Sequence, residues 1–118
     1  MTMLRIFSDE HGMARITDLD PALRQVADGL GRSATVAVSS ASIFIAPPGG
    51  GHGEQPEARR QLAVVLAGSC TVTASGETRT CRPGDLLLVE DTAGVGHSST
   101  TDEGFTALMV TLAEGADW

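Results

Sequence analysis

The chain has 118 residues, 42% of them hydrophobic and 19% charged, which is the size and balance of one globular domain spanning 1–118. No apolar run approaches ~18 residues, and 15 acidic against 8 basic residues give a net charge of −7; this excludes membrane-spanning helices and the basic surface that nucleic-acid binding needs. The N-terminus lacks the apolar core and cleavage site of a secretory signal, which predicts a cytoplasmic protein whose two cysteines are free thiols.

The first third of the chain is predicted to contain two short strands and one helix. Short apolar stretches at Met3–Phe7 and Gly12–Leu19 favour strands, the first of them at a sheet edge. Asp20 as N-cap, Pro21 at the first helical position and a glycine near the end favour a helix over 21–30.

From Ser33 onward the pattern is that of short strands separated by turns. The apolar positions change parity near Ser40, which predicts a β-bulge or bend there. The glycine- and proline-rich segment 46–57 is predicted as a loop. Further strands are expected at Gln61–Ala67, Cys70–Ala74, Glu77–Arg82, Leu86–Val89 and Phe105–Leu112. Roughly eight short strands in a chain of this length predict an all-β fold, a small barrel or jelly roll.

The hairpin after Gly68 allows a prediction of its register. With Ser75 and Gly76 as the two turn residues, threonines face each other on one side of the hairpin and the two cysteines on the other. The predicted pairs are Thr73 with Thr78, Thr71 with Thr80, and Cys70 with Cys81.

Segment 49–97 carries an ordered set of motifs. They are a proline–glycine loop, a strand from Gln61 to Gly68, the hairpin, the turn Pro83-Gly84-Asp85 before an apolar strand, and the loop Glu90-Asp-Thr-Ala-Gly-Val-Gly-His97. This set resembles the cupin superfamily, in particular single-domain members with a lengthened second motif. The resemblance implies a double-stranded β-helix, or jelly-roll barrel, usually homodimeric, with a small-molecule pocket that holds a divalent metal in many members.

The metal ligands of that family are poorly matched here. Counted back from Gly68, the four ligand positions fall on Gln55, Glu57, Gln61 and His97 or, with a longer gap, on Glu54, Pro56, Gln61 and His97. Only His97 keeps the usual ligand type, so we expect no cofactor. The alternative is a divalent ion, Fe, Mn, Ni or Zn, held by His52, Glu54 or Glu57, and His97.

These residues favour a small cupin enzyme that isomerises or cyclises an organic molecule. We expect His97 to act as acid and base, with Gln61 and Glu57 as further catalytic residues. The residues expected to contact the substrate are His52, Arg59, Ala63, Phe105 and Met109.

Several alternatives remain open from the sequence. A metal-dependent oxygenase or isomerase, a non-catalytic binding module and a structural dimer each use the same fold. Gln61 lies outside the pocket if Leu62 and Val64 face inward. The partners expected are a small molecule and a second copy of the chain, paired through its first strands, with no nucleic acid and no membrane.

Overall fold

Twelve strands and no helix make up the computed structural model, which describes residues 1–118. In chain order the strands are β1 Met3–Ser8, β2 Ala14–Asp18, β3 Arg24–Ala27, β4 Leu30–Arg32, β5 Val38–Ala46, β6 Gly51–Gln55, β7 Gln61–Gly68, β8 Cys70–Ala74, β9 Glu77–Cys81, β10 Leu86–Glu90, β11 His97–Thr100 and β12 Phe105–Leu112. The all-β prediction is confirmed. No helix is present that could cross a membrane.

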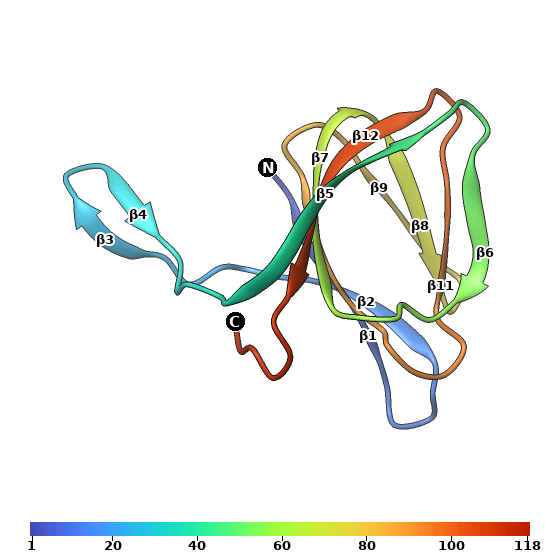
Figure 1. Cartoon of the computed structure of the whole chain (residues 1–118), viewed down its shortest axis with the longest axis horizontal. Helices are drawn as coiled ribbons and strands as arrows, with labels where there is room; N and C mark the ends of the chain where they lie inside the picture. The colour runs from blue at the N-terminus through green and yellow to red at the C-terminus, as the bar shows by residue number, and fades with distance from the viewer.

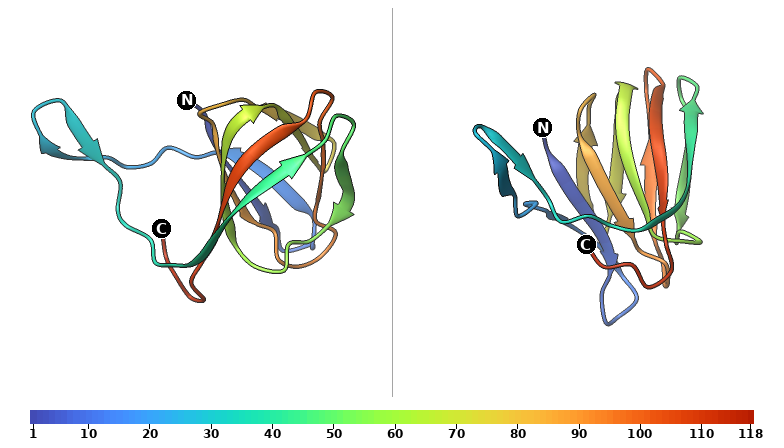
Figure 2. Two further views of the ribbon diagram at one scale, coloured as in Figure 1. Left: turned by 45° about the horizontal axis from the view of Figure 1, so that its top comes forward. Right: turned by 60° about the vertical axis from the view of Figure 1, so that its left-hand side comes forward.

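Two sheets face each other and enclose the core (Figures 1 and 2). The larger sheet has the order β2-β1-β10-β7-β12-β5, and the smaller has the order β6-β11-β8-β9. Side chains from the inner faces of both sheets form one apolar cluster: Leu4, Ile6, Ala14, Ile16, Ala63, Val65, Cys70, Val72, Ala74, Cys81, Leu87 and Val89. The members of this cluster alternate along their strands, as Ala63 and Val65 do on β7, because one face of each sheet is turned toward the core.

The predicted helix over 21–30 is wrong. This segment forms the separate two-stranded sheet β3–β4, which projects from the body of the molecule (Figure 1). Leu23, Val26 and Leu30 have helix-like spacing, but all three are exposed. The apolar face of a helix here would therefore have no core to pack against. A helix of about nine residues is marginal without such packing. Gly29, at a φ of 72°, instead supplies the turn of a hairpin.

Two further expectations need correction. β1 is not an edge strand, because it pairs with β10 on one side and with β2 on the other. It therefore has no free edge with which to pair across a two-fold axis. The segment predicted as a loop contains β6, which pairs with β11. The glycines of β6 tolerate strand geometry. This segment is a strand because it pairs with β11 and not because its composition favours one.

The hairpin register is confirmed at every predicted pair. Cys70 lies opposite Cys81 as a free, buried thiol pair. The hydroxyls of Thr71 and Thr80 are 3.1 Å apart, and those of Thr73 and Thr78 are 3.0 Å apart. Ser75 and Gly76 have φ values of 50° and 80°, as a type I′ turn requires. The predicted bulge near Ser40 is also present, where the pairing of β5 with β12 skips Ser39.

Candidate functional site

A cavity of about 230 Å³ lies between the two sheets. Its wall consists of Phe44, His52, Gln55, Glu57, Ala63, Val65, Cys70, Val72, Cys81, Leu87, Val89, His97, Ser99, Phe105, Ala107 and Met109. Most of these side chains are apolar. The ionisable groups other than the two thiols gather around His97, so the cavity has a distinct polar end.

His97 is fixed at this end by Asp91. The Asp91 side chain is fully buried, and its Oδ2 accepts two hydrogen bonds from His97: one from the backbone N–H at 2.9 Å and one from ring Nδ1 at 2.7 Å. Asp91 Oδ1 is buried without a hydrogen-bond partner, so both hydrogen bonds of this carboxylate come from His97. The pair holds the other ring nitrogen, Nε2, free to act in the cavity.

The loop before His97 is shaped by close backbone contact. Gly96 has a φ of 79°, and a Cβ at this position would overlap the backbone of Gln55 and Pro56. On the same side, the Glu57 N–H donates to the Asp91 carbonyl at 3.0 Å. These two contacts bring residues 55–57 against the loop, and Glu57 Oε1 then lies 3.9 Å from His97 Nε2.

His52 completes the polar end from strand β6. Its ring lies edge-on to the ring of His97, with centroids 5.0 Å apart. His52 Nδ1 lies 2.8 Å from the carbonyl oxygen of Gly53. Because that oxygen can only accept, Nδ1 is the donor in this contact, and Nε2 is the acceptor nitrogen of the neutral ring.

One ligand atom from each of His52, Glu57 and His97 lies within 4.8 Å of the others. Nδ1 of each histidine contacts an oxygen outside this cluster, so in the neutral rings Nε2 is an acceptor, and His97 Nε2 faces the Glu57 carboxylate. Such a cluster needs a positive partner, either a proton or a cation. The three residues therefore form a candidate site for proton transfer or for a divalent metal.

The cavity has a second, less polar end on the hairpin. Cys70 lies three residues beyond Thr73, which pairs with the neighbour of His97 on β11. His97 lies one residue further along, so at ~3.4 Å per residue the thiols are roughly 14 Å from His97 along the sheet. Burial raises the pKa of both Cys70 and Cys81 to about 11, so both remain protonated thiols at neutral pH.

The structure brings together most, but not all, of the residues proposed from the sequence. The cavity wall includes His52, Glu57, Ala63, His97, Phe105 and Met109. Gln61, Arg59 and Glu54 are not part of it. Gln61 begins β7 two residues before Ala63, which is the first wall residue of that strand. Arg59 lines a separate surface hollow with Arg60 and Glu114.

Glu54 is turned away by a β-bulge. The pairing of β6 with β11 runs from Gln55 opposite His97 to His52 opposite Ser99, so Gly53 and Glu54 together face Ser98. This extra residue places His52 and Gln55 on the same side and leaves Glu54 exposed. The two-residue alternation of a regular strand does not predict this bulge from the sequence.

Two residues of this site were not proposed as functional. Gln55 occupies the first ligand position of the three-residue-gap alignment, where its amide differs from the usual histidine. Asp91 lies in the Glu-Asp-Thr loop before His97, and only the fold shows that its carboxylate contacts the His97 ring. A carboxylate in a loop that ends at a histidine is the signal that could have indicated it.

The fold and the site define a cupin. Residues 34–107 match the family of EutQ-like cupin domains, and the chain belongs to that family. The predicted membership of the cupin superfamily is thereby confirmed. Among curated proteins, none matches the chain.

Solved structures support the same fold. A cupin superfamily protein from Desulfitobacterium hafniense is 24% identical, with 68% of this chain and 72% of that chain aligned and a TM-score of 0.53. An RmlC-like cupin from Shewanella frigidimarina is 16% identical, with 90% and 88% aligned and a TM-score of 0.54. A conserved protein of unknown function from Streptococcus pyogenes is 22% identical, with a TM-score of 0.52; 61% of each chain is aligned, so the match spans about three fifths of that protein.

Proposed function

We propose that this cupin is an enzyme that moves a proton on a small, uncharged organic molecule, in an isomerisation or a cyclisation, with His97 as the acid and base. The observation that carries the proposal is the hydrogen bond from His97 Nδ1 to the buried Asp91, which leaves Nε2 as the free nitrogen at the cavity's polar end. A general base held in this way contributes roughly 10²–10⁴-fold to a proton-transfer rate.

The wall of the cavity limits the class of ligand. It contains no lysine or arginine, while Glu57 lies in the wall and Asp91 behind it. A carboxylate or phosphate entering this site would meet negative charge without a compensating cation. The apolar wall and the volume of about 230 Å³, just below the usual ~300–1,000 Å³ of ligand pockets, favour a compact neutral molecule with one polar group.

The roles of the residues follow from their contacts. The substrate's carbon–hydrogen bond breaks as its proton passes to His97 Nε2, and His97 returns that proton to another atom of the same molecule. Asp91 keeps the Nδ1 proton in place and stabilises the charged ring during the interval. Gln55 and Glu57 lie at the same end and would orient the substrate's polar group.

A divalent metal is the second candidate, favoured by the convergence of His52, Glu57 and His97. Two imidazoles and one carboxylate suit Fe, Mn, Ni or Zn, and the contact of His97 with Asp91 is the support that metal-bound histidines commonly have. A bound ion would supply Lewis-acid chemistry. It would also reverse the ligand preference, because the site would then accept anionic oxygen.

The tautomer of His97 provides a test that needs no substrate. Ring ¹⁵N NMR of the intact chain should place the proton of neutral His97 on Nδ1, and Asp91→Asn should change this distribution. His11, an exposed histidine, is the internal reference. A proton found on Nε2 of His97 would contradict both candidates, since neither base nor ligand could then face the cavity.

Proton exchange tests the chemistry itself. In D₂O, the protein should accelerate deuterium uptake at the α-carbons of cyclohexanone and 2-tetralone more than that of levulinate, which is anionic. His97→Gln should lower this exchange by roughly 10²-fold or more, and His11→Gln should not change it. Equal acceleration by wild type and His97→Gln would reject His97 as the base.

Metal binding separates the two candidates. Calorimetric titration with Zn²⁺ and Mn²⁺ should show binding that His52→Ala and Glu57→Gln abolish, whereas Glu54→Gln, on the exposed side of β6, leaves it intact. Under the metal candidate, levulinate becomes the better ligand of the loaded protein. Exchange that persists in chelator supports the metal-free enzyme.

A further inference from the structure

The cavity opens on one side of the molecule, between the edges of the two sheets. β5 is the last strand of the larger sheet and β6 is the last strand of the smaller one, and the two strands do not pair with each other. Among the side chains of the cavity wall, only Phe44 on β5 and Gln55 on β6 are exposed, whereas all wall residues from β7 to β11 are buried. A ligand therefore enters between β5 and β6.

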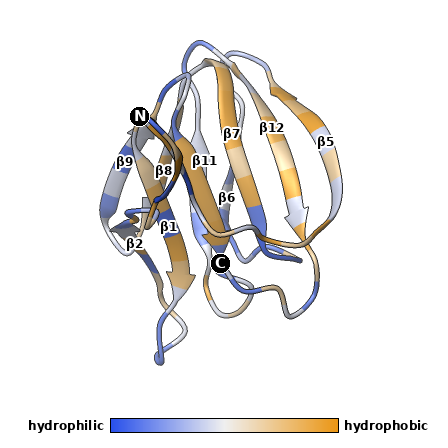
Figure 3. Ribbon diagram, turned by 90° about the vertical axis from the view of Figure 1, so that its left-hand side faces the viewer, coloured by the Kyte–Doolittle hydropathy of each residue, from blue (hydrophilic) through white to orange (hydrophobic).

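The polar groups of the wall are confined to one part of it. Apart from the two thiols, every polar side chain in the wall comes from β6, from Glu57 just after it, or from β11. The wall residues of β5 and β12 are Phe44, Phe105, Ala107 and Met109, whose side chains carry no oxygen or nitrogen. Figure 3 shows hydrophobic stretches on both of these strands. A ligand that turns its polar group to β6 and β11 thus places its apolar part against β5 and β12.

Two phenylalanines form the apolar wall next to the opening. Phe44 lies opposite Ala107 of β12, and Phe105 lies two residues before Ala107 on the same strand. The two rings have centroids 5.7 Å apart and are tilted by 31°. Phe44 is 49% exposed and does not belong to the apolar core cluster. Its ring therefore contributes little to the core and is available to a ligand.

The strand register places this pair away from His97. Phe105 lies opposite Gly68, which leads into Cys70, so Phe105 belongs to the thiol end of the cavity. β12 runs from there to the polar end, where its last residues pair with the start of β7, and Phe44 lies between the two ends. A volume of about 230 Å³ spread over a length of roughly 14 Å makes the cavity a narrow slot.

From this arrangement we propose that the substrate is a neutral molecule with an aromatic ring, which packs against Phe44 and Phe105 while the reacting polar group lies at His97. This inference rests on the proposed function, which places the reaction at His97. A flat ring fits a narrow slot better than a puckered one. Aromatic rings attract each other at centroid separations of ~4.5–7 Å, so a third ring beside the pair would extend the contact that Phe44 and Phe105 already make.

Sulfur atoms line much of the remaining apolar wall. Cys70, Cys81 and Met109 all contribute to it. Sulfur makes favourable contacts with the edges of aromatic rings at separations of ~5 Å. The two thiols are uncharged at neutral pH, so they do not bring charge against the ring. These side chains favour an aromatic ring over a saturated ring of the same size.

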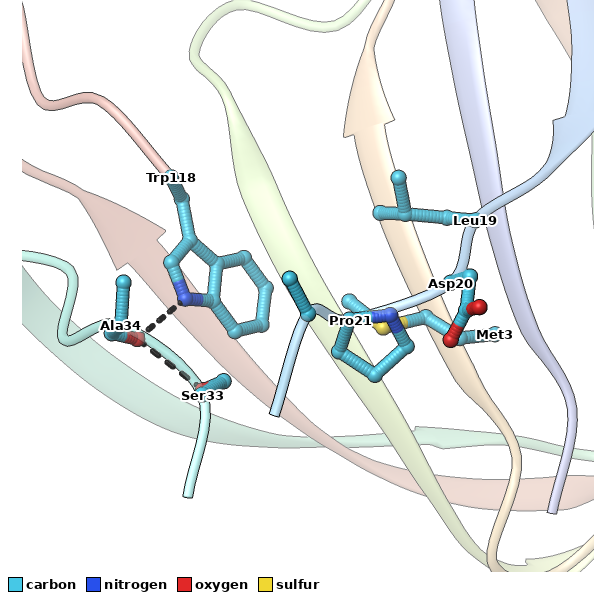
Figure 4. A pocket seen from close by; sticks show the side chains of 8 residues that line it. Met3, Leu19, Asp20, Pro21, Ser33, Ala34 and Trp118 are labelled. Carbon is cyan, nitrogen blue, oxygen red and sulfur yellow. Dashed lines mark hydrogen bonds between the residues drawn. The ribbon is translucent and has the colours of Figure 1, made fainter. Parts of the chain in front are cut away.

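A second pocket can also receive an aromatic molecule, and a binding test has to separate the two. It has a volume of about 220 Å³ and lies between Met3, Pro21 and Trp118 (Figure 4). The Trp118 indole N–H donates to the Ala34 carbonyl at 2.7 Å. Because Trp118 is the only tryptophan and is not part of the cavity wall, its fluorescence reports a ligand in this second pocket.

Calorimetric titration in the presence of chelator should compare 4-phenylcyclohexanone with 4-cyclohexylcyclohexanone, two neutral ketones that differ only in the second ring. The wild-type protein should bind the phenyl compound about fivefold more tightly or better. Phe44→Leu and Phe105→Leu should each reduce this preference to about twofold or less. Phe7→Leu, at the one phenylalanine outside the cavity wall, is the matched control and should keep the preference, as should Trp118→Ala. Because Phe44 is half exposed, circular dichroism should show Phe44→Leu folded.

The same titration separates this inference from the proposed reaction. His97→Gln should retain the preference for the phenyl compound while deuterium exchange is lost, and preferential binding without any exchange in wild type would support the aromatic site alone. Equal affinity of wild type for the two ketones, binding of neither, or a preference that survives Phe44→Leu would overturn the inference. A change in Trp118 fluorescence that follows the binding curve would also overturn it, because the ring would then lie in the second pocket.

Discussion

The two ends of the cavity are built in different ways. At the thiol end, Cys70 and Cys81 meet because a two-residue turn folds one short stretch of chain back on itself. At the polar end, His52, Glu57 and His97 come from three separate pieces: a bulged strand, the segment after it and the end of a loop forty residues later. A local ladder specifies the first end, whereas the second exists only when distant segments pack correctly.

This difference predicts where the molecule is vulnerable. The hairpin pairs reinforce one another along both strands, so each replacement loses one contact among several. The polar end depends on a few close approaches for which there is no substitute. Changes to the contacts that assemble this end, at Gly96 and Asp91, should cost more stability than changes of the same size elsewhere.

Gly96→Ala should have the largest effect. Its φ of 79° disfavours any side chain, and the added Cβ would overlap the backbone of Gln55. We expect a loss of about 3 kcal/mol in the free energy of unfolding, measured by urea titration. Gly53→Ala is the matched control, because nothing lies within 4 Å of its added Cβ, and it should change stability by less than about 0.5 kcal/mol. Similar costs for both would mean that the polar end is not assembled by this contact.

Asp91→Asn should have the next largest effect. The buried carboxylate accepts two hydrogen bonds from His97, and an amide can repeat only part of that pattern. The expected cost is about 2 kcal/mol in the free energy of unfolding. Glu57→Gln, at a half-buried carboxylate without a close hydrogen bond, should cost much less. An Asp91→Asn protein as stable as wild type would show that His97 is held by other contacts.

The thiol end should show a smaller, pH-dependent effect. Burial raises the pKa of Cys70 and Cys81 from the ordinary value of 9.0 to about 11. A raised pKa means that the protonated thiols stabilise the fold fully below pH 9, and that this contribution is lost as the pH rises through 11. Urea titrations at pH 8 and pH 10.5 should therefore show a decline that the Cys70→Ala, Cys81→Ala double variant lacks. The same decline in both proteins would assign it to other groups.

His52→Ala should have the smallest effect on stability, less than about 0.5 kcal/mol, because this half-buried ring bonds only to its neighbour's carbonyl. Its effect should fall on Zn²⁺ affinity instead, which calorimetry would measure. A marked loss of stability in this variant would show that His52 supports the polar end as His97 does.

The sequence by itself determined what depends on local pattern. Turn residues at 75–76 set the register of the cysteine pair, and alternating apolar residues set the all-β class. The order of motifs from 49 to 97 gave the cupin superfamily, which the family match confirms. These features follow from turn chemistry and side-chain alternation, which act over a few residues.

Only the tertiary structure decided the composition of the site and the conformation of segment 21–30. Glu54 and Gln55 exchange places because β6 bulges against β11, and Gln61 is excluded because the wall formed by β7 begins at Ala63. Asp91 acts on His97 through a loop closed by Gly96 against residues far along the chain. Segment 21–30 has apolar residues at helical spacing but no core to pack on, so it forms the strand pair β3–β4. In each case the deciding contact joins residues distant in sequence, and local pattern carries no information about which distant segment will be there.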